Sequence, residues 1–123
     1  MNGFNDVSID RVASSILSLL GVEKDPDMGR EIESITEKRR CHRVIMYNPD
    51  AVAQWIYEGH RDLFSPILER IDLNIEMLSM VPPVTPVCFA SMYSGLLPEK
   101  HGIREYIKPV LKCRTVFDVL SQN

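Results

Sequence analysis

The sequence lacks the features that mark a secreted, disulfide-stabilised or membrane-spanning protein. Its three cysteines are odd in number and widely separated, with no C-x-x-C pair and no histidine at zinc-finger spacing. This pattern indicates neither a disulfide framework nor a structural zinc site, and it favours reduced thiols in the cytoplasm. No apolar run reaches the roughly 18 residues of a membrane span, and no basic segment precedes an apolar one at the N-terminus. We therefore expect a cytoplasmic protein without a membrane partner.

The sequence also lacks an excess of positive charge. Its 14 Lys and Arg residues against 17 Asp and Glu residues give a formal net charge of -3. Binding to a nucleic-acid backbone needs concentrated Lys and Arg, so we expect no nucleic-acid partner. The charge is nevertheless uneven, because residues 1–83 are acidic whereas residues 84–123 carry more Lys and Arg than Asp and Glu. That imbalance would suit an anionic substrate, although a small positive excess is more often simply a solvated surface.

The composition is that of an ordinary globular protein, with 45% hydrophobic and 25% charged residues in a chain of 123. This length supports one modest core. We expect residues 1–123 to form a single domain or the N-terminal portion of a larger α/β domain. Residues 1–42 would be a helical lead-in, and residues 43–123 would hold a strand–helix–strand unit and a segment with candidate catalytic residues.

Two helices are expected in the lead-in. Apolar residues recur at helical spacing over residues 9–20, with Ser8 before them as a cap and Gly21 after them at the position of a left-handed C-terminal cap. A second helix is expected over residues 28–38, since acidic residues come early in it and basic residues late, as the helix dipole favours.

The pattern of residues 43–80 predicts an α/β fold with a small parallel sheet flanked by helices. Arg43–Tyr47 is rich in strand-forming residues, helical spacing occupies residues 51–71, and residues 74–80 alternate partially like a second strand. A strand–helix–strand unit implies a parallel pair with a right-handed crossover. A last helix, within residues 108–122, is expected to begin after Thr115 as its cap.

Side chains with catalytic or ligating chemistry follow the two expected strands. Asn48 and Asp50 follow the first strand and Thr85 follows the second, at the strand ends where α/β folds bind ligands. Oxygen donors there suit a metal ion, although Asn-Pro-Asp is also an ordinary turn.

Thr85, Cys88 and Ser91 are the candidate nucleophiles. Thr85 stands at the start of a helix-like run, where free N–H groups and the helix dipole favour a phosphate, although a threonine there is also an ordinary cap. Cys88 and Ser91 would share a helix face, and because no histidine is near them in sequence we favour packing roles for both. His101 is expected to hydrogen-bond its own loop into place.

The segment from Thr85 to Ile103 resembles a known family. Thr85-Pro86 before a short helix, followed by Ser94-Gly95-Leu96-Leu97-Pro98-Glu99-Lys100-His101-Gly102-Ile103, is similar to the nucleophile segment of the type I phosphodiesterase and nucleotide pyrophosphatase branch of the alkaline phosphatase superfamily. The resemblance covers roughly residues 43–121. It implies an alkaline-phosphatase-like layer structure and a metal-dependent phosphodiesterase or phosphatase activity, in which Thr85 attacks phosphorus.

The resemblance also implies two divalent metal ions, usually zinc, with Thr85 as one ligand. The family's first strand ends in a metal-binding Asp-Gly, which here is replaced by Asn48-Pro49-Asp50. Either Asn48 or Asp50 would be the ligand, and we favour Asp50 because carboxylates bind divalent cations better than amides. The family's remaining Asp and His ligands come from a long region after the nucleophile, and the residues after Gly102 offer only Asp118.

The shortage of ligands leaves two functions open. One is a phosphoric ester hydrolase, incomplete in this chain, that acts on a phosphate ester. The other is a noncatalytic α/β domain that keeps the scaffold and associates with itself or a partner, because a partial sheet would leave an edge to cover. A sulfatase-like enzyme using Cys88 is disfavoured, since the Cys-x-Pro-Ser-Arg context is absent.

Overall fold

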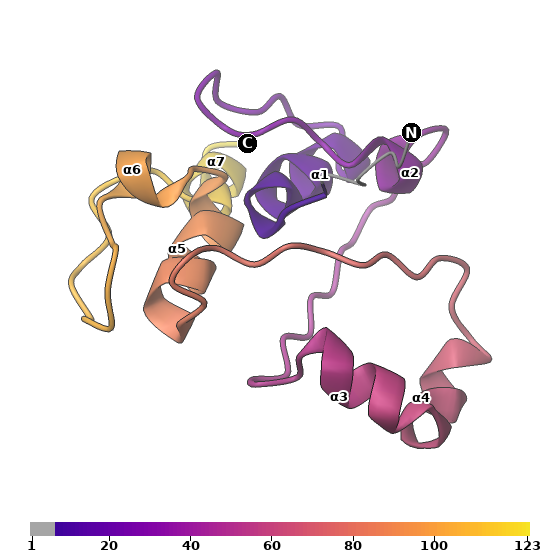
Figure 1. Cartoon of the computed structure of the whole chain (residues 1–123). Helices are drawn as coiled ribbons and strands as arrows, with labels where there is room; N and C mark the ends of the chain where they lie inside the picture. The colour runs from indigo at the N-terminus through magenta and orange to yellow at the C-terminus, as the bar shows by residue number, and fades with distance from the viewer. Residues whose placement is uncertain (1–6) are drawn as a thin grey trace, which may run out of the picture. The chain divides into compact units, whose positions relative to one another are not determined.

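The structure, a computed structural model, describes residues 7–123 and divides the chain into two compact units. Unit 1 consists of the described residues up to Ile45 together with Met77–Asn123, and unit 2 is Met46–Glu76 (Figure 1). Unit 1 is therefore discontinuous in sequence. No helix between residues 7 and 123 has both the length and the apolar character that crossing a bilayer requires.

The predicted α/β fold is wrong. Residues 7–123 form helices and no sheet, and their one β-type pairing is an isolated parallel bridge between Ser8 and Leu78. The expected strand at Arg43–Tyr47 has no partner, and its Ile45 and Tyr47 side chains are 93% and 84% exposed. A run of strand-forming residues becomes a strand only where another strand accepts its backbone hydrogen bonds.

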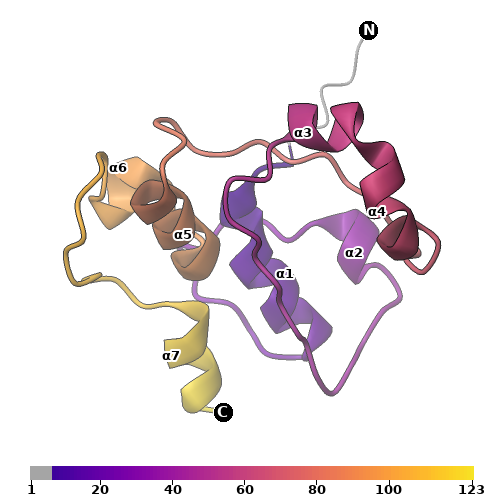
Figure 2. The ribbon, with the colours of Figure 1, turned by 90° about the horizontal axis from the view of Figure 1, so that it is seen from below.

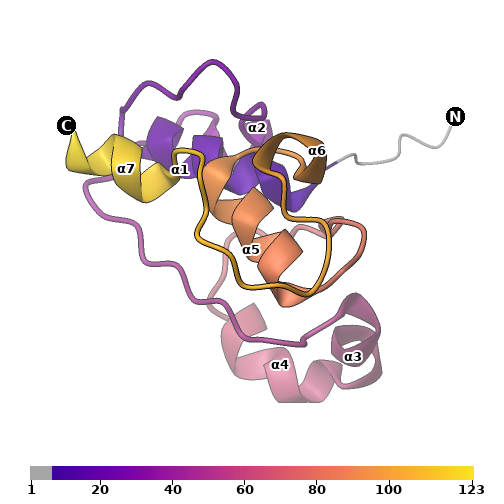
Figure 3. The same ribbon diagram turned by 90° about the vertical axis from the view of Figure 1, so that its left-hand side faces the viewer.

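Unit 1 contains one 3-10 helix and five α-helices. Their bounds are η1 Ile9–Arg11, α1 Val12–Leu19, α2 Glu33–Thr36, α5 Thr85–Ser94, α6 Pro98–His101 and α7 Val116–Ser121. Helix α1 is central, since it packs against α2, α5 and α7, and Figure 2 shows it between α2 and α5. Helix α6 packs against α5, beside which it lies in Figure 3.

The first predicted helix is confirmed as η1 followed by α1. Gly21 has a φ of 71° and ends this helix in the left-handed region, as its position predicted. Ser8 occupies the N-cap position of η1, but its hydroxyl donates to the Asp10 carboxylate instead of capping the backbone. The position was predicted correctly, and the hydrogen bond was not.

The second predicted helix, over residues 28–38, is mostly absent, and only Glu33–Thr36 is helical. Backbone N–H groups in this stretch donate hydrogen bonds to other segments of the chain instead of to carbonyls within a helix. The N–H of Gly29 donates to the carbonyl of Gly95 at 2.7 Å, and the N–H of Ile32 donates to Ser15 Oγ at 2.8 Å. Lys38, at a φ of 59°, then lies outside the helical region.

Two clusters of apolar side chains form the core of unit 1. The first joins α1, the segment before α2, and α7, and consists of Ala13, Leu17, Met28, Val116 and Val119. The second lies around α5 and the loop after α6, and consists of Met80, Val87, Ala90 and Ile103. The second cluster fixes the buried face of α5, so it also determines which residues of that helix remain accessible.

Unit 2 contains the helices α3, Gln54–Gly59, and α4, Arg61–Leu68. They lie within the predicted helical stretch 51–71. Tyr57 joins the two helices. Its ring meets the Phe64 ring edge-on, with the two ring centroids 5.2 Å apart, and it lies under the Arg61 guanidinium. Its hydroxyl accepts a hydrogen bond from Asn74 Nδ2 at 2.9 Å. None of the residues from Met46 to Glu76 is buried.

Candidate functional site

Thr85 is the first residue of α5. Val84 precedes it in an extended conformation, and the carbonyl of Val84 accepts the N–H of Cys88 at 3.0 Å, which closes the first helical turn. Pro86 follows in the first turn, where proline is tolerated because the missing N–H has no helical acceptor. Thr85 is exposed, so the sequence placed this candidate nucleophile correctly at an accessible helix start.

The other two candidate nucleophiles belong to the packed side of α5. Ser91 is 0% exposed, and Cys88 is half-buried against the second apolar cluster. Val87 and Ala90, also on α5, are buried in the same cluster. The packing roles expected for Cys88 and Ser91 are therefore confirmed.

His101 connects α5 to the loop that follows α6. Its Nε2 lies 2.9 Å from Ser91 Oγ, and its Nδ1 accepts the backbone N–H of Ile103 at 3.1 Å. Because Nδ1 is an acceptor, the proton of the neutral ring is on Nε2, which donates to Ser91. His101 therefore cannot serve as the base that activates Ser91, and it holds the loop as the sequence predicted.

Burial lowers the pKa of His101 below its ordinary value, because desolvation disfavours the imidazolium, and the nearby Glu99 carboxylate partly opposes this by raising it. The residue is buried, with 7% of its surface exposed. The neutral form required by the Ile103 hydrogen bond is thus also the form that the surroundings favour.

The remaining residues of the Ser94–Ile103 segment have structural tasks. Ser94 Oγ donates to the carbonyl of Ala90 and accepts from the N–H of Leu96. Gly95 adopts a φ of 71° and ends α5. Gly102, at a φ of 84°, ends α6 in the same way. Both conformations favour glycine.

Met28 and Gly29 support this segment from the other stretch of unit 1. The carbonyl of Gly95 accepts the N–H of Gly29 at 2.7 Å, and a Cβ at position 95 would lie 3.0 Å from Met28 Cβ. The sequence analysis missed this contact. The only local signal for it is Gly29, which interrupts the expected helix of residues 28–38.

Two of the three predicted metal ligands belong to unit 2. Asn48 and Asp50 lie in the irregular segment before α3, and Asp50 is exposed. They do not follow a strand, contrary to the sequence prediction, because the described chain has no strand there. Thr85 belongs to unit 1, so the predicted ligands are divided between the two units.

Within residues 7–123 no group of three or more His, Cys, Asp or Glu side chains could hold a metal ion. A site with two divalent ions needs several such ligands, held in a fixed geometry. The residues that the structure describes therefore do not fit a two-metal centre.

Comparisons with protein-family models, curated proteins and solved structures found no match for this chain. The resemblance carried by residues 85–103 accordingly stays a prediction.

Proposed function

We propose that this chain carries the nucleophile segment of a phosphoric ester hydrolase, with Thr85 as the nucleophile. The observation that supports the proposal is the contrast along α5: Thr85 is exposed at the first turn, whereas Cys88 and Ser91 pack inward. The helix is held from behind by the Ser91–His101–Ile103 hydrogen bonds. A hydroxyl on a rigid, accessible helix start is well placed to meet a phosphate.

In the proposed reaction Thr85 Oγ1 forms a bond to phosphorus, and the bond from phosphorus to the ester oxygen breaks. The hydroxyl proton of Thr85 leaves with the departing alcohol. Water then cleaves the phosphothreonine and regenerates Thr85. The zinc ions implied by the resemblance would need ligands in addition to Asn48, Asp50 and Thr85, so no step is assigned to them.

Hydrolysis of bis(p-nitrophenyl) phosphate by the full chain, with zinc or manganese added, tests the proposal. Thr85→Ser keeps a hydroxyl and should retain activity, whereas Thr85→Val keeps the branched shape without the hydroxyl and should be reduced to background. Mass spectrometry of the peptide containing residue 85 should show the phosphorylated intermediate in the wild type and in Thr85→Ser, but not in Thr85→Val.

Two results would overturn this assignment. Wild-type activity in Thr85→Val would exclude Thr85 as the nucleophile. A wild-type chain without activity in either metal would exclude hydrolysis by this polypeptide and favour the noncatalytic alternative. That alternative can no longer rest on a sheet edge, because residues 7–123 contain no sheet.

A further inference from the structure

Unit 2 exposes an unusual amount of apolar surface for two packed helices. Trp55 on α3 and Leu63 on α4 are each 72% exposed, and Ile67 is 57% exposed. Since no residue of the unit is buried, its own contacts cover little of this surface. Exposed apolar surface of this kind marks an interaction site.

The charge of unit 2 is strongly acidic. Residues 46–76 contain six carboxylates and two arginines. Asp72 lies between Ile71 and Leu73, both of them exposed, so negative charge and apolar surface occur together. Such a surface repels anionic lipids and nucleic acids, and it attracts a partner that is apolar and basic.

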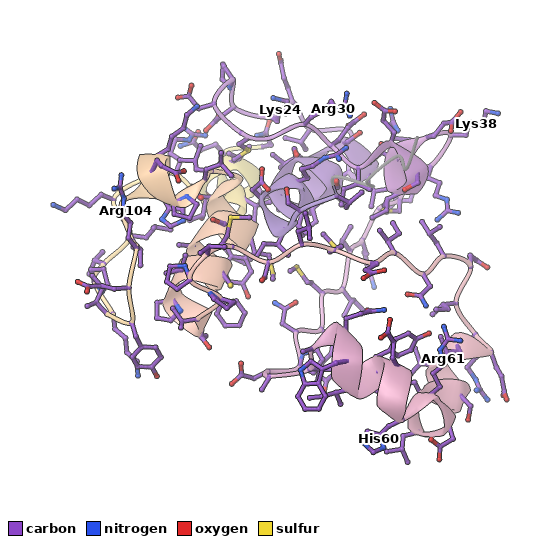
Figure 4. All side chains as sticks on the ribbon, viewed as in Figure 1. Lys24, Arg30, Lys38, His60, Arg61 and Arg104 are labelled. Atoms are coloured by element: carbon purple, nitrogen blue, oxygen red, sulfur yellow. The ribbon has the colours of Figure 1, made fainter. Side chains whose placement is uncertain are left out.

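Unit 1 presents a segment with this complementary chemistry. The basic loop, defined as residues 104–112, lies in the long connection between α6 and α7 (Figure 1). It carries Arg104, Lys108 and Lys112 against one carboxylate, and all three cations are exposed. Figure 4 labels Arg104, where the loop begins. Its Tyr106 and Val110 side chains are 67% and 88% exposed.

We infer that the basic loop of one molecule docks on unit 2 of a second copy of this chain. The two surfaces have opposite charge, and each offers exposed apolar side chains. Contact between them would pair the charges and bury the apolar side chains. Because every copy carries both surfaces, two copies can pair reciprocally, and that reciprocal pair is a closed symmetric dimer. The inference does not depend on the proposed hydrolysis, since neither surface includes Thr85.

Charge reversal on each surface tests the inference with the full chain. Asp72→Lys/Glu76→Lys removes the net negative charge of unit 2, because four carboxylates then stand against four Lys and Arg residues, and in Lys108→Glu/Lys112→Glu both surfaces are acidic. All four positions lie outside the helices, so the folds should be retained. Each variant should raise the Kd of dimerisation about tenfold or more, because the first loses the charge attraction between the two surfaces and the second makes it repulsive. An equimolar mixture of the two variants should associate again, since the unaltered basic loop of the first variant complements the unaltered unit 2 of the second.

Sedimentation velocity over a series of protein concentrations provides the measurement. The wild type should dimerise more weakly as salt concentration rises. The control variant Glu23→Lys/Glu37→Lys makes the same change of net charge at exposed positions of unit 1 and should leave the Kd unchanged. Three results would each overturn the inference. The wild type could stay monomeric, either charge-reversal variant on its own could dimerise as the wild type does, or the mixture of the two could fail to associate.

Discussion

At the scale of the residue, His101 determines how the loop after α6 is held against α5. Its two ring nitrogens have different tasks, because Nδ1 accepts from Ile103 and Nε2 donates to Ser91. A protonated ring would have a proton on both nitrogens and would lose its bond with the Ile103 N–H. The segment is therefore held by a histidine that must stay neutral.

The lowered pKa of His101 predicts a pH-dependent stability. The unfolded chain takes up the proton near pH 6.5 and the folded chain only at lower pH. The free energy of unfolding contributed by this ring is therefore fully present above about pH 6.5 and is lost as the pH falls through the folded pKa. Urea unfolding of the wild type at a series of pH values should show the free energy of unfolding fall as the pH is lowered. In His101→Gln this fall should be smaller.

His60→Gln, which replaces an exposed histidine of unit 2, is the control and should keep the wild-type dependence. His101→Gln should also unfold about 1–3 kcal/mol more readily near neutral pH, because buried hydrogen-bonding groups lose a partner. Equal pH dependence in wild type and His101→Gln would contradict the proposed role of the ring.

Two glycines with the same backbone angle allow strain and crowding to be separated. Gly21 and Gly95 both have a φ of 71°, but a Cβ has no neighbour within 4 Å at Gly21 and lies 3.0 Å from Met28 at Gly95. Gly21→Ala should cost about 1–2 kcal/mol for the left-handed conformation. Gly95→Ala should cost a further 1–3 kcal/mol or so, because Met28 is buried and must move. An equal loss in the free energy of unfolding for the two variants, measured by thermal or urea unfolding, would show that the Met28 side chain moves without a significant cost.

At the scale of the element, α7 depends on the hydrogen bonds at its start. The Thr115 hydroxyl accepts the N–H of Asp118 and donates to the Asp118 carboxylate, which also accepts the N–H of Thr115 at 2.7 Å. This capping box holds the short helix whose Val116 and Val119 complete the first apolar cluster. Thr115→Ala should therefore destabilise the protein by about 1 kcal/mol, whereas Thr115→Ser should change little.

The same hydrogen bonds lower the pKa of Asp118. Stability from a carboxyl with a lowered pKa is present above its unfolded pKa and is lost as the pH falls through the folded one. The difference in the free energy of unfolding between the wild type and Thr115→Ala, measured by urea unfolding, should therefore become smaller below about pH 4. A constant difference would show that the carboxylate contributes nothing to the cap.

The elements that the sequence predicted correctly depend on local signals. Gly21 ends α1, Thr85 begins α5 and Thr115 caps α7, each through groups within a few residues. The strand at Arg43–Tyr47 and the helix of residues 28–38 failed because their outcome depends on distant partners. The expected strand has no strand to pair with. In the expected helix, backbone N–H groups donate instead to Ser15 and Gly95.

The same distinction applies to the candidate site. The position of Thr85 and the loop-holding task of His101 followed from nearby residues, but Ser91 as the partner of His101 did not. Periodicity placed Ser91 on a packed face without indicating which group it meets. The division of Thr85 from Asn48 and Asp50 between two units followed from the missing sheet, which no short pattern could reveal.

At the scale of the whole molecule, the two units should differ in resistance to proteolysis. Unit 1 has two buried apolar clusters, whereas residues 46–76 have no buried residue. Local opening needs less free energy where less surface is buried. Limited trypsin digestion should therefore cleave after Arg61 or Arg70 before it cleaves after Arg11 or Arg114, and the resulting fragments should remain associated through unit 1. Early cleavage after Arg11 or Arg114 would contradict this order.

The bridge between Ser8 and Leu78 joins the two stretches of unit 1 across all of unit 2. During folding α1 can form early from local interactions, but α5 and α7 reach it only after the intervening chain has closed into a loop. We expect slower folding than in a helical bundle of similar length. The entropy of closure grows only logarithmically, and doubling the loop costs about 0.6 kcal/mol more. The stretch between Ile45 and Met77 is consequently a place where evolution could lengthen this chain at little thermodynamic cost.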